Sequence, residues 1–274
     1  MSLFTVDQEK CNRDGICAAE CPNSIIDMAS PGDYPEPASD AEQYCLACGH
    51  CVAVCLQGAL SLNWLAPGDC LPARREMALT AEQAEHFLRS RRSIRTFKRR
   101  SVEREKLEKL LETACYAPSA KNQQPWHWLV IEDTREVRRL AGLVVVWMRD
   151  VIRTDRELAD RFALVRVVEA WDSGEERICR GAPHVIIAHG DKDLAFGAED
   201  CALALDYLEL FAPSLGLGTC WGGYFYTAVN RYPPLFETLG LPDDHRAYGA
   251  MMVGYPEFTY QRLPERNPPR VTWR

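Results

Sequence analysis

Apolar residues recur at helical spacing in two segments that follow residue 79. Thr80 and Gln83 form the pattern of a capping box, which predicts a helix from residue 80 to about residue 91. In residues 103–117, leucine and alanine recur on one face and predict a second helix. Because proline disfavours helical backbone at the residue before it, this helix is expected to end before Pro118.

Three short apolar runs bounded by turn residues predict strands over residues 126–132, 183–190 and 247–255. Residues 197–218 predict a largely apolar helix that ends at its last two glycines. Residues 141–171 also have a helical pattern with one apolar side, which favours a core role over a lid. Strands and helices do not alternate regularly, so the expected fold class is α+β.

The chain has no apolar segment of the length that a membrane crossing requires. Its longest apolar run, residues 143–148, is suited to a protein core. The first ten residues lack the basic and then apolar order of a signal peptide. We therefore expect a cytoplasmic protein with no membrane partner.

Seven of the twelve cysteines lie in two tight runs near the N-terminus. The second run has the spacing Cys45-x2-Cys48-x2-Cys51-x3-Cys55. A shift of 34 residues superposes the first run on it, so that Cys11, Asp14, Cys17 and Cys21 fall on Cys45, Cys48, Cys51 and Cys55. The two runs are an internal duplication in which Asp14 occupies a ligand position. Among the scattered cysteines, Cys179 and Cys201 are expected to be buried small apolar residues.

This spacing is typical of bacterial iron–sulfur proteins, in which the fourth cysteine of each run ligates the other cluster. One cluster is expected to be held by Cys45, Cys48, Cys51 and Cys21, and the other by Cys11, Asp14, Cys17 and Cys55. Structural zinc, the alternative, usually takes two close pairs of ligands a dozen or more residues apart. Residues 1–72 resemble a two-cluster ferredoxin domain.

The two predicted clusters differ in one ligand, because Asp14 takes the place of a cysteine in one of them. A carboxylate is a harder ligand than a thiolate, so it is expected to bind its iron less firmly. Three alternatives remain open: a [4Fe-4S] cluster with one oxygen ligand, a [3Fe-4S] cluster with that corner empty, or a solvated Asp14 that ligates nothing. The other predicted cluster has four cysteines and is expected to be [4Fe-4S].

The charge of the chain changes near residue 73. Up to that residue there are two basic and ten acidic side chains, a net charge of −8, whereas the rest has 30 basic and 29 acidic ones. This break predicts two domains and argues against nucleic acid as a partner of the first. We expect a linker over residues 73–79 and a second domain over residues 80–274.

Seven basic side chains surround Ser93 in residues 89–100. Arginine forks beside a hydroxyl supply the charge and the directed donors that a phosphate monoester needs. The alternative is a solvated basic face. A nucleic-acid site is not expected, because aromatic residues do not interleave with the basic ones and the second domain is nearly neutral.

Two further segments favour a flat heterocyclic ligand. The polar loop after Pro118 carries Asn122 and two glutamines, whose amides can pair with the edge of such a ring. Residues 216–223 include four glycines, which let the backbone approach a ring closely; a helix cap and turn is the alternative. They follow a helix rather than a strand, so they are not a dinucleotide fingerprint.

Taken together, these motifs resemble the nitroreductase-like FMN-dependent oxidoreductase family. The resemblance covers residues 80–274 and depends on the segments RRSIRTF, APSAKNQQPW, SLGLGTCWGGYF and YGAMMVGYPEF followed by RNPP. It implies that FMN is bound by Arg91, Arg92, Ser93, Arg95, Pro118, Ser119, Asn122, Trp221, Gly222, Gly223 and Arg266. The basic residues and Ser93 would hold the phosphate and ribityl chain, and Gly222 and Gly223 would lie near flavin N5.

The resemblance also implies a homodimer with FMN at the subunit interface. The tail supports it independently, because its three prolines exclude a helix over residues 262–274. Val271 and Trp273 would be buried if such an extended tail crossed to a partner subunit.

The fused ferredoxin-like domain suggests that electrons reach FMN through the clusters, one at a time, with a redox protein or NAD(P)H as the source. FMN would then reduce a small organic acceptor, such as a nitroaromatic, quinone or enone, by hydride transfer. No catalytic acid is named; Tyr224, Tyr226 and His127 are candidates that are as readily explained by packing. The alternative function is a non-catalytic flavoprotein that relays electrons to a protein partner or senses redox state.

Overall fold

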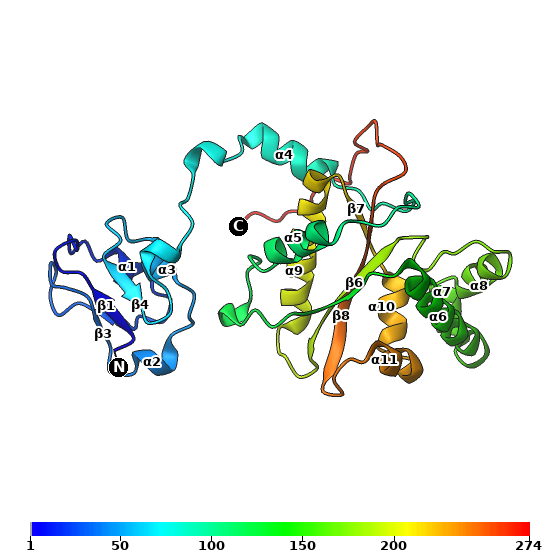
Figure 1. The fold of residues 1–274 in the computed structure, drawn as a ribbon, viewed down its shortest axis with the longest axis horizontal. Coiled ribbons are helices and arrows are strands. Elements are labelled where there is room, and N and C mark those ends of the chain that lie inside the picture. Colours follow the sequence, from blue (N-terminus) through cyan, green and yellow to red (C-terminus); the bar gives the residue numbers. More distant parts are fainter. Residues whose placement is uncertain (1) are drawn as a thin grey trace. The chain divides into compact units, whose positions relative to one another are not determined.

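The computed structural model describes residues 2–274, which divide into two compact units (Figure 1). The first unit extends to Leu79 and includes residues 121–123; the second comprises residues 80–120 and 124–274. Residues 73–79, predicted as a linker, contain the 3₁₀ helix η2 (Arg75–Met77) and belong to the first unit.

Short strands and single helical turns make up the first unit. Strand β1 (Phe4–Val6) pairs antiparallel with β4 (Leu60–Leu62), and β2 (Ile26–Asp27) pairs with β3 (Glu36–Pro37). The other elements are α1 (Ile16–Glu20), α2 (Ala41–Tyr44), α3 (His50–Ala53) and the 3₁₀ helix η1 (Pro67–Asp69). Its core has few large side chains, because its buried members are Leu3, Phe4, Ile25, Ile26, Ala41, Val52, Leu60 and Leu62.

The internal duplication is visible in the backbone of this unit. Gly15 and Gly49, which are 34 residues apart, both have a left-handed conformation, with φ of 74° and 72°. Each immediately precedes a short helix, α1 or α3. Two further pairs at the same separation also have positive φ: Arg13 with Ala47, and Ser24 with Gly58. Positive φ is uncommon outside glycine, so the repeated cysteine runs share one backbone path.

A four-stranded antiparallel sheet forms the centre of the second unit, in the order β5-β6-β8-β7. The predicted strands are β5 (His127–Ile131), β6 (His184–Asp191) and β8 (His245–Gly254). The edge strand β7 (Gly218–Trp221) was missed, because its glycine-rich sequence was interpreted as a cap, a turn or a ring contact. Cys179 and Cys201 are fully buried, as expected.

Helices cover both faces of this sheet (Figure 1). The predicted helices are α4 (Ala81–Ser90), α5 (Arg104–Ala114) and α9 (Gly197–Phe211). Residues 141–171 fall into α6 (Thr134–Thr154), α7 (Arg156–Arg161) and α8 (Leu164–Asp172). The remaining elements are α10 (Gly223–Val229), α11 (Pro233–Leu239), η3 (Ala120–Asn122) and η4 (Ala212–Leu215). No helix in the described residues has the length and apolar character needed to cross a membrane.

Alternate residues of β6 point into two separate cores. Val185 and Ile187 pack with α6, whereas Ile186 and Ala188 pack with α5 and α9. This period of two places one helical layer on each side of the sheet. The core role expected for residues 141–171 is confirmed, because α6 buries Val144, Val145, Trp147 and Met148.

Gly218 allows the segment after α4 to approach β7 closely. A Cβ at Gly218 would lie 2.4 Å from Cγ1 of Ile94, whereas a Cβ at Gly223 would meet no atom within 4 Å. We therefore expect Gly218→Ala to lower the free energy of unfolding by about 1–3 kcal/mol through overpacking. Gly223→Ala, the control, should not lower it. Denaturant unfolding followed by circular dichroism measures both, and equal stability of the two variants would contradict the packing described.

Candidate functional site

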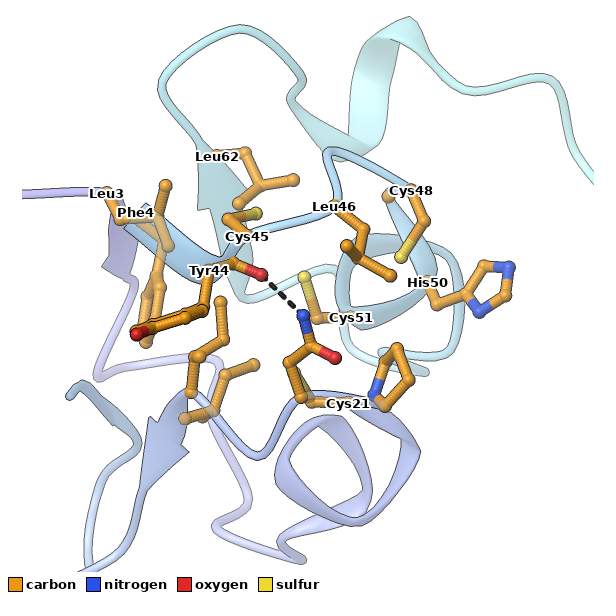
Figure 2. Close-up of a pocket in the computed structure, with 15 residues that line it drawn as sticks. Leu3, Phe4, Cys21, Tyr44, Cys45, Leu46, Cys48, His50, Cys51 and Leu62 are labelled. Atoms are coloured by element: carbon orange, nitrogen blue, oxygen red, sulfur yellow. Dashed lines mark hydrogen bonds between the residues drawn. The ribbon is translucent and has the colours of Figure 1, made fainter. Parts of the chain in front are cut away.

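Four cysteines from two separate segments line one cavity in the first unit. Figure 2 shows Cys21 beside Cys45, Cys48 and Cys51, with Phe4 and Leu62 among the apolar residues around them. The amide of Asn23 donates to the carbonyl oxygen of Tyr44 at 2.6 Å and ties the two segments together. The cavity therefore brings the last cysteine of the first run to the first three of the second.

A second cavity of the first unit is lined by the first three ligand positions of the first run and by the last cysteine of the second run. Cys11, Asp14 and Cys17 line it together with Cys55. One oxygen of Asp14 accepts a hydrogen bond from the backbone N–H of Ile16 at 3.1 Å. The other carboxylate oxygen of Asp14 makes no hydrogen bond within residues 2–274, so its lone pairs have no donor among these residues.

The half-buried thiols need a positive charge nearby before they can ionise. Burial raises the pKa of Cys51 to about 11, and it raises the pKa of Cys17 as well. Thiolate ligands therefore form here together with a metal, not before it. In the described part of the chain, no three His, Cys, Asp or Glu side chains converge closely enough for a single ion. A four-iron cluster is larger and spreads its ligands over its corners.

In the second unit, Arg91 forms a buried ion pair that the sequence did not predict. Nη1 of Arg91 lies 2.8 Å from Oε1 of Glu209 on α9, and the Glu209 side chain is only 6% exposed. Burial raises the pKa of the Glu209 carboxyl, and the Arg91 guanidinium opposes that change. The signal that could have identified Glu209 is its helical spacing from Cys201 and Leu205, which places a carboxylate on the buried face of α9.

The other basic residues of the segment have different surroundings. Arg92 folds back on the end of α4 and donates to the carbonyl oxygens of Arg89 and Arg91 at 2.9 and 2.6 Å. Its Nε is buried without a partner among the described residues. Arg95 is exposed, and the carbonyl oxygen of the half-buried Ser93 accepts from Tyr260 at 3.5 Å. Of the three arginines of this segment predicted to hold the phosphate, Arg95 is thus the one whose side chain makes no hydrogen bond or ion pair within residues 2–274, and Arg91 is held by Glu209.

The loop after Pro118 has an unusual backbone. Lys121, Asn122 and Gln124 all have positive φ, between 46° and 55°, which is costly for residues with a Cβ. The hydroxyl of Ser119 accepts from the N–H of Gln124 at 2.9 Å and closes the loop. Within the first unit, the Asn122 amide donates to the carbonyl oxygens of Leu46 and Ala47 at 3.2 Å.

Asp200 is a second carboxylate of α9 that the sequence did not single out. It is 4% exposed, and its Oδ1 accepts from the backbone N–H of Ala120 at 2.9 Å. This bond fixes the start of the loop that follows Pro118. Asp200 and Glu209 thus anchor, from one helix, the two segments predicted to hold the phosphate and the ring.

The four glycines of the glycine-rich segment have separate roles. Gly216 has φ of 73° and caps η4, and Gly218 admits Ile94. The buried Gly222 donates its N–H to Ala250 at 2.8 Å, which fixes the end of β7 against β8. Gly223 borders open space, and Trp221 beside them is 38% exposed. Gly223 is therefore the glycine of this segment that is placed to meet a ligand, and the predicted contact of Gly222 with the ring stays a prediction.

The C-terminal tail is extended and exposed. Residues 259–274 contain no helix or strand, and Arg266 is exposed within them. Trp273 is 90% exposed and Val271 is 53% exposed. The predicted contact of Arg266 with a phosphate stays a prediction.

The candidate acids have protein partners. Tyr224 donates to the carbonyl oxygen of Phe162 at 3.0 Å, and Tyr226 packs against the core on the α6 side. His127 belongs to a cluster of three histidines at one end of the sheet. Its ring centroid lies 5.5 Å from that of His189 and 4.9 Å from that of His245. Nδ1 of His189 lies 2.9 Å from Nδ1 of His245.

Comparison with protein families decides the class of the second unit. Residues 88–255, more than half of the chain, match the model of the nitroreductase family. The chain belongs to the nitroreductase family. Residues 4–56 match a 4Fe-4S dicluster domain, so this oxidoreductase carries an N-terminal ferredoxin-type domain. The predicted fold class is thereby confirmed.

Several relatives align with the nitroreductase part. An Archaeoglobus fulgidus protein named as an NADH dehydrogenase/NAD(P)H nitroreductase is 28% identical over 69% of this chain and 97% of its own length. A 4-nitrobenzoate reductase of Pseudomonas putida is 27% identical over 65% of this chain and 88% of its own. A Bacteroides fragilis nitroreductase solved with bound FMN shares the fold with a TM-score of 0.59 at 23% identity, over 69% of this chain and 97% of that one.

The Arg91–Glu209 pair predicts a difference between two substitutions at one position. Glu209→Ala should lower the free energy of unfolding by about 2–3 kcal/mol, because it strips a partly buried guanidinium of its counter-charge. Glu209→Gln should cost much less, since its amide oxygen still accepts a hydrogen bond from Arg91 and the buried carboxylate is replaced by a neutral group. Asp206→Ala, an exposed acid on α9, serves as the control. Denaturant titration measures all three; equal losses for Ala and Gln would refute the role of the pair.

The histidine cluster predicts a loss of stability in mild acid. Burial, with help from His245 and His127, lowers the pKa of His189 from 6.5 to about 4. The unfolded chain therefore binds a proton between these values that the folded chain does not, and the free energy of unfolding should fall as pH drops from 6.5 towards 4. His189→Gln should flatten this dependence, and exposed His86→Gln should not. Unchanged slopes in both variants would contradict the assignment.

Proposed function

We propose that this chain is a ferredoxin-fused, FMN-dependent reductase of small organic acceptors. Two iron–sulfur clusters in the first unit would supply electrons singly, and bound FMN would deliver them in pairs as hydride. The acceptor class we propose is nitroaromatic, quinone or enone compounds. The observation that carries the proposal is the presence, in one chain, of two reciprocal cysteine cavities and a nitroreductase fold.

The residues lining the two cavities fit a pair of clusters. We propose Cys21, Cys45, Cys48 and Cys51 as the ligands of one cluster and Cys11, Asp14, Cys17 and Cys55 as those of the other. The shared backbone path supports the place of Asp14, because its neighbour Gly15 has the same left-handed conformation as Gly49 beside Cys48. Two cavities that exchange their fourth ligand are what crossed ligation requires.

The second unit has groups that fit FMN. Arg91, held by Glu209, and the unpaired Arg95 flank Ser93 and supply charge and a hydroxyl suited to a phosphate monoester. The open space beside Gly223 leaves room for a flat ring against the backbone. The segment anchored by Asp200 supplies the hydroxyl of Ser119, which accepts from the N–H of Gln124 and can still donate its proton to a ligand. We propose that Arg92 and Trp221 also contact FMN at this site.

We further propose a homodimer with FMN at the subunit interface. Several large apolar side chains of the tail are exposed in the single chain: Phe258, Tyr260, Leu263, Val271 and Trp273. Burial of this set against a second copy would remove apolar surface from water. Arg266, which lies in the same tail, would then reach a phosphate near the interface.

The proposal is tested by cofactor content and turnover. Anaerobically purified protein should contain about eight irons or slightly fewer, matching sulfide and one FMN per chain. It should consume 4-nitrobenzoate or a quinone when a one-electron donor such as reduced methyl viologen is supplied. Zinc in place of iron, or iron without flavin, would refute it. Full cofactor content without turnover of any small acceptor would favour an electron-relay protein instead.

Asp14 predicts that one cluster loses iron more easily than the other. Brief oxidation should convert the wild-type cluster at Asp14 to a three-iron form, because the carboxylate holds its iron less firmly. Asp14→Cys should suppress the three-iron signal in electron paramagnetic resonance. Cys48→Asp, which places the same ligand at the equivalent position of the other run, should make the second cluster labile too. An Asp14→Cys variant with an unchanged signal would show that Asp14 is not a ligand.

A further inference from the structure

A basic cavity lies in the second unit, and none of the residues predicted to hold a cofactor lines it. Its volume is about 640 Å³, a size typical of small-molecule sites. Three segments form it: residues 97–101, the first turns of α6 and the loop over residues 176–183 that leads into β6. The nitroreductase site described above does not account for this cavity.

The lining of this cavity is strongly positive. Six cationic side chains contribute to it: Lys98, Arg99, Arg100, Arg135, Arg138 and Arg180. Glu176 is the one carboxylate in the lining. It already accepts the backbone N–H groups of Ile178 and Cys179 at 2.6 Å and of Gly181 at 2.8 Å. Its negative charge is therefore directed at the loop rather than at the cations.

Most of these cations lack a counter-charge. Arg100 pairs with Glu103 at 2.5 Å, and Arg135 pairs with Asp133 at 3.4 Å. In residues 2–274, the other four make no ion pair; they are Lys98, Arg99, Arg138 and Arg180. Like charges gathered around one hollow repel each other, and a bound anion would relieve that repulsion.

The charge of the cavity comes from side chains and not from a helix end. Asp133 caps α6 by accepting the N–H of Arg135 at 2.8 Å, so a carboxylate already occupies the N-terminus of the helix. Thr134 donates its hydroxyl to the carbonyl oxygen of Pro183 at 3.2 Å. An incoming anion would therefore be held by guanidinium groups, which bind phosphate oxygens in pairs.

The floor of the cavity is apolar. Phe97, Val137 and Ala182 are buried there, at 8%, 2% and 1% exposure, and Pro183 is buried beside them. A bare inorganic anion would leave this surface unused. A ligand with an apolar or aromatic body and a phosphate end would contact both the floor and the basic rim.

We propose that this cavity binds a small molecule that carries a pyrophosphate group on an aromatic body, as a nucleoside diphosphate does. The four unpaired cations would neutralise the pyrophosphate, and the floor around Phe97 would contact the body. The site is separate from the proposed flavin site, and it does not depend on the reaction proposed above.

The test is calorimetric titration of the full-length protein, loaded with one FMN per chain and freed of excess, with ADP and with inorganic pyrophosphate at physiological ionic strength. ADP should bind at least as tightly as pyrophosphate. Arg138→Ala and Arg99→Ala should each weaken ADP binding about tenfold or more, as expected for loss of a charge-assisted hydrogen bond. Arg166→Ala, which removes an exposed cation on α8 outside the cavity, should leave the affinity unchanged.

Several results would overturn the proposal. Absence of ADP binding at millimolar concentration would do so, as would an equal effect of Arg166→Ala and Arg138→Ala, which would indicate attraction to net charge alone. Tighter binding of pyrophosphate than of ADP would refute a place for the aromatic body. Loss of ADP binding on loading with FMN would make the cavity part of the flavin site. Unfolding of the variants is excluded by their thermal transitions, which should match that of the wild type because both side chains are exposed.

Discussion

Two buried carboxylates on helix α9 fix the segments on which the proposed flavin site depends. Burying a carboxylate without a partner is costly, so the hydrogen-bond partners of Asp200 and Glu209 are held in place. Asp200 holds the backbone at Ala120, and Glu209 holds the guanidinium of Arg91. Because both lie on one helix packed against the sheet, Ala120 and Arg91 keep a fixed separation within the second unit. A preorganised site of this kind loses little entropy when it binds a cofactor.

The first unit depends on a different constraint. Its core has eight buried residues, which is little for an independent fold, and five of the cysteines pack directly against it. The thiols are half buried and have raised pKa values at Cys17 and Cys51, so they are poor ligands until a metal compensates the charge. Folding and cluster assembly are thus expected to be coupled, as in other small metal-binding domains.

The sequence predicted the features that depend on local spacing. The cysteine register, the capping box of α4 and the strands β5, β6 and β8 follow from patterns within a few residues of each other. Thr80 and Gln83 do exchange hydrogen bonds as the capping-box pattern requires. What it missed depends on contacts between distant residues. Strand β7 is formed by pairing with β8, about 30 residues later in the chain, and Glu209 matters because Arg91, 118 residues earlier, reaches it. No local pattern encodes such pairs, although an acidic residue on the buried face of a helix, as Glu209 is on α9, indicates that a partner is needed. The family match covers residues 88–255, and the contacts proposed for the cofactors remain predictions.

We propose that electrons reach the flavin through the clusters of the same chain. This proposal is tested most directly by anaerobic stopped-flow reduction with a one-electron donor, monitoring cluster and flavin absorbance together in the wild type and in a Cys45→Ser/Cys48→Ser variant that retains FMN. We expect cluster bleaching to precede flavin bleaching in the wild type and flavin reduction to become much slower in the variant. Flavin reduction at the same rate in both proteins would contradict it.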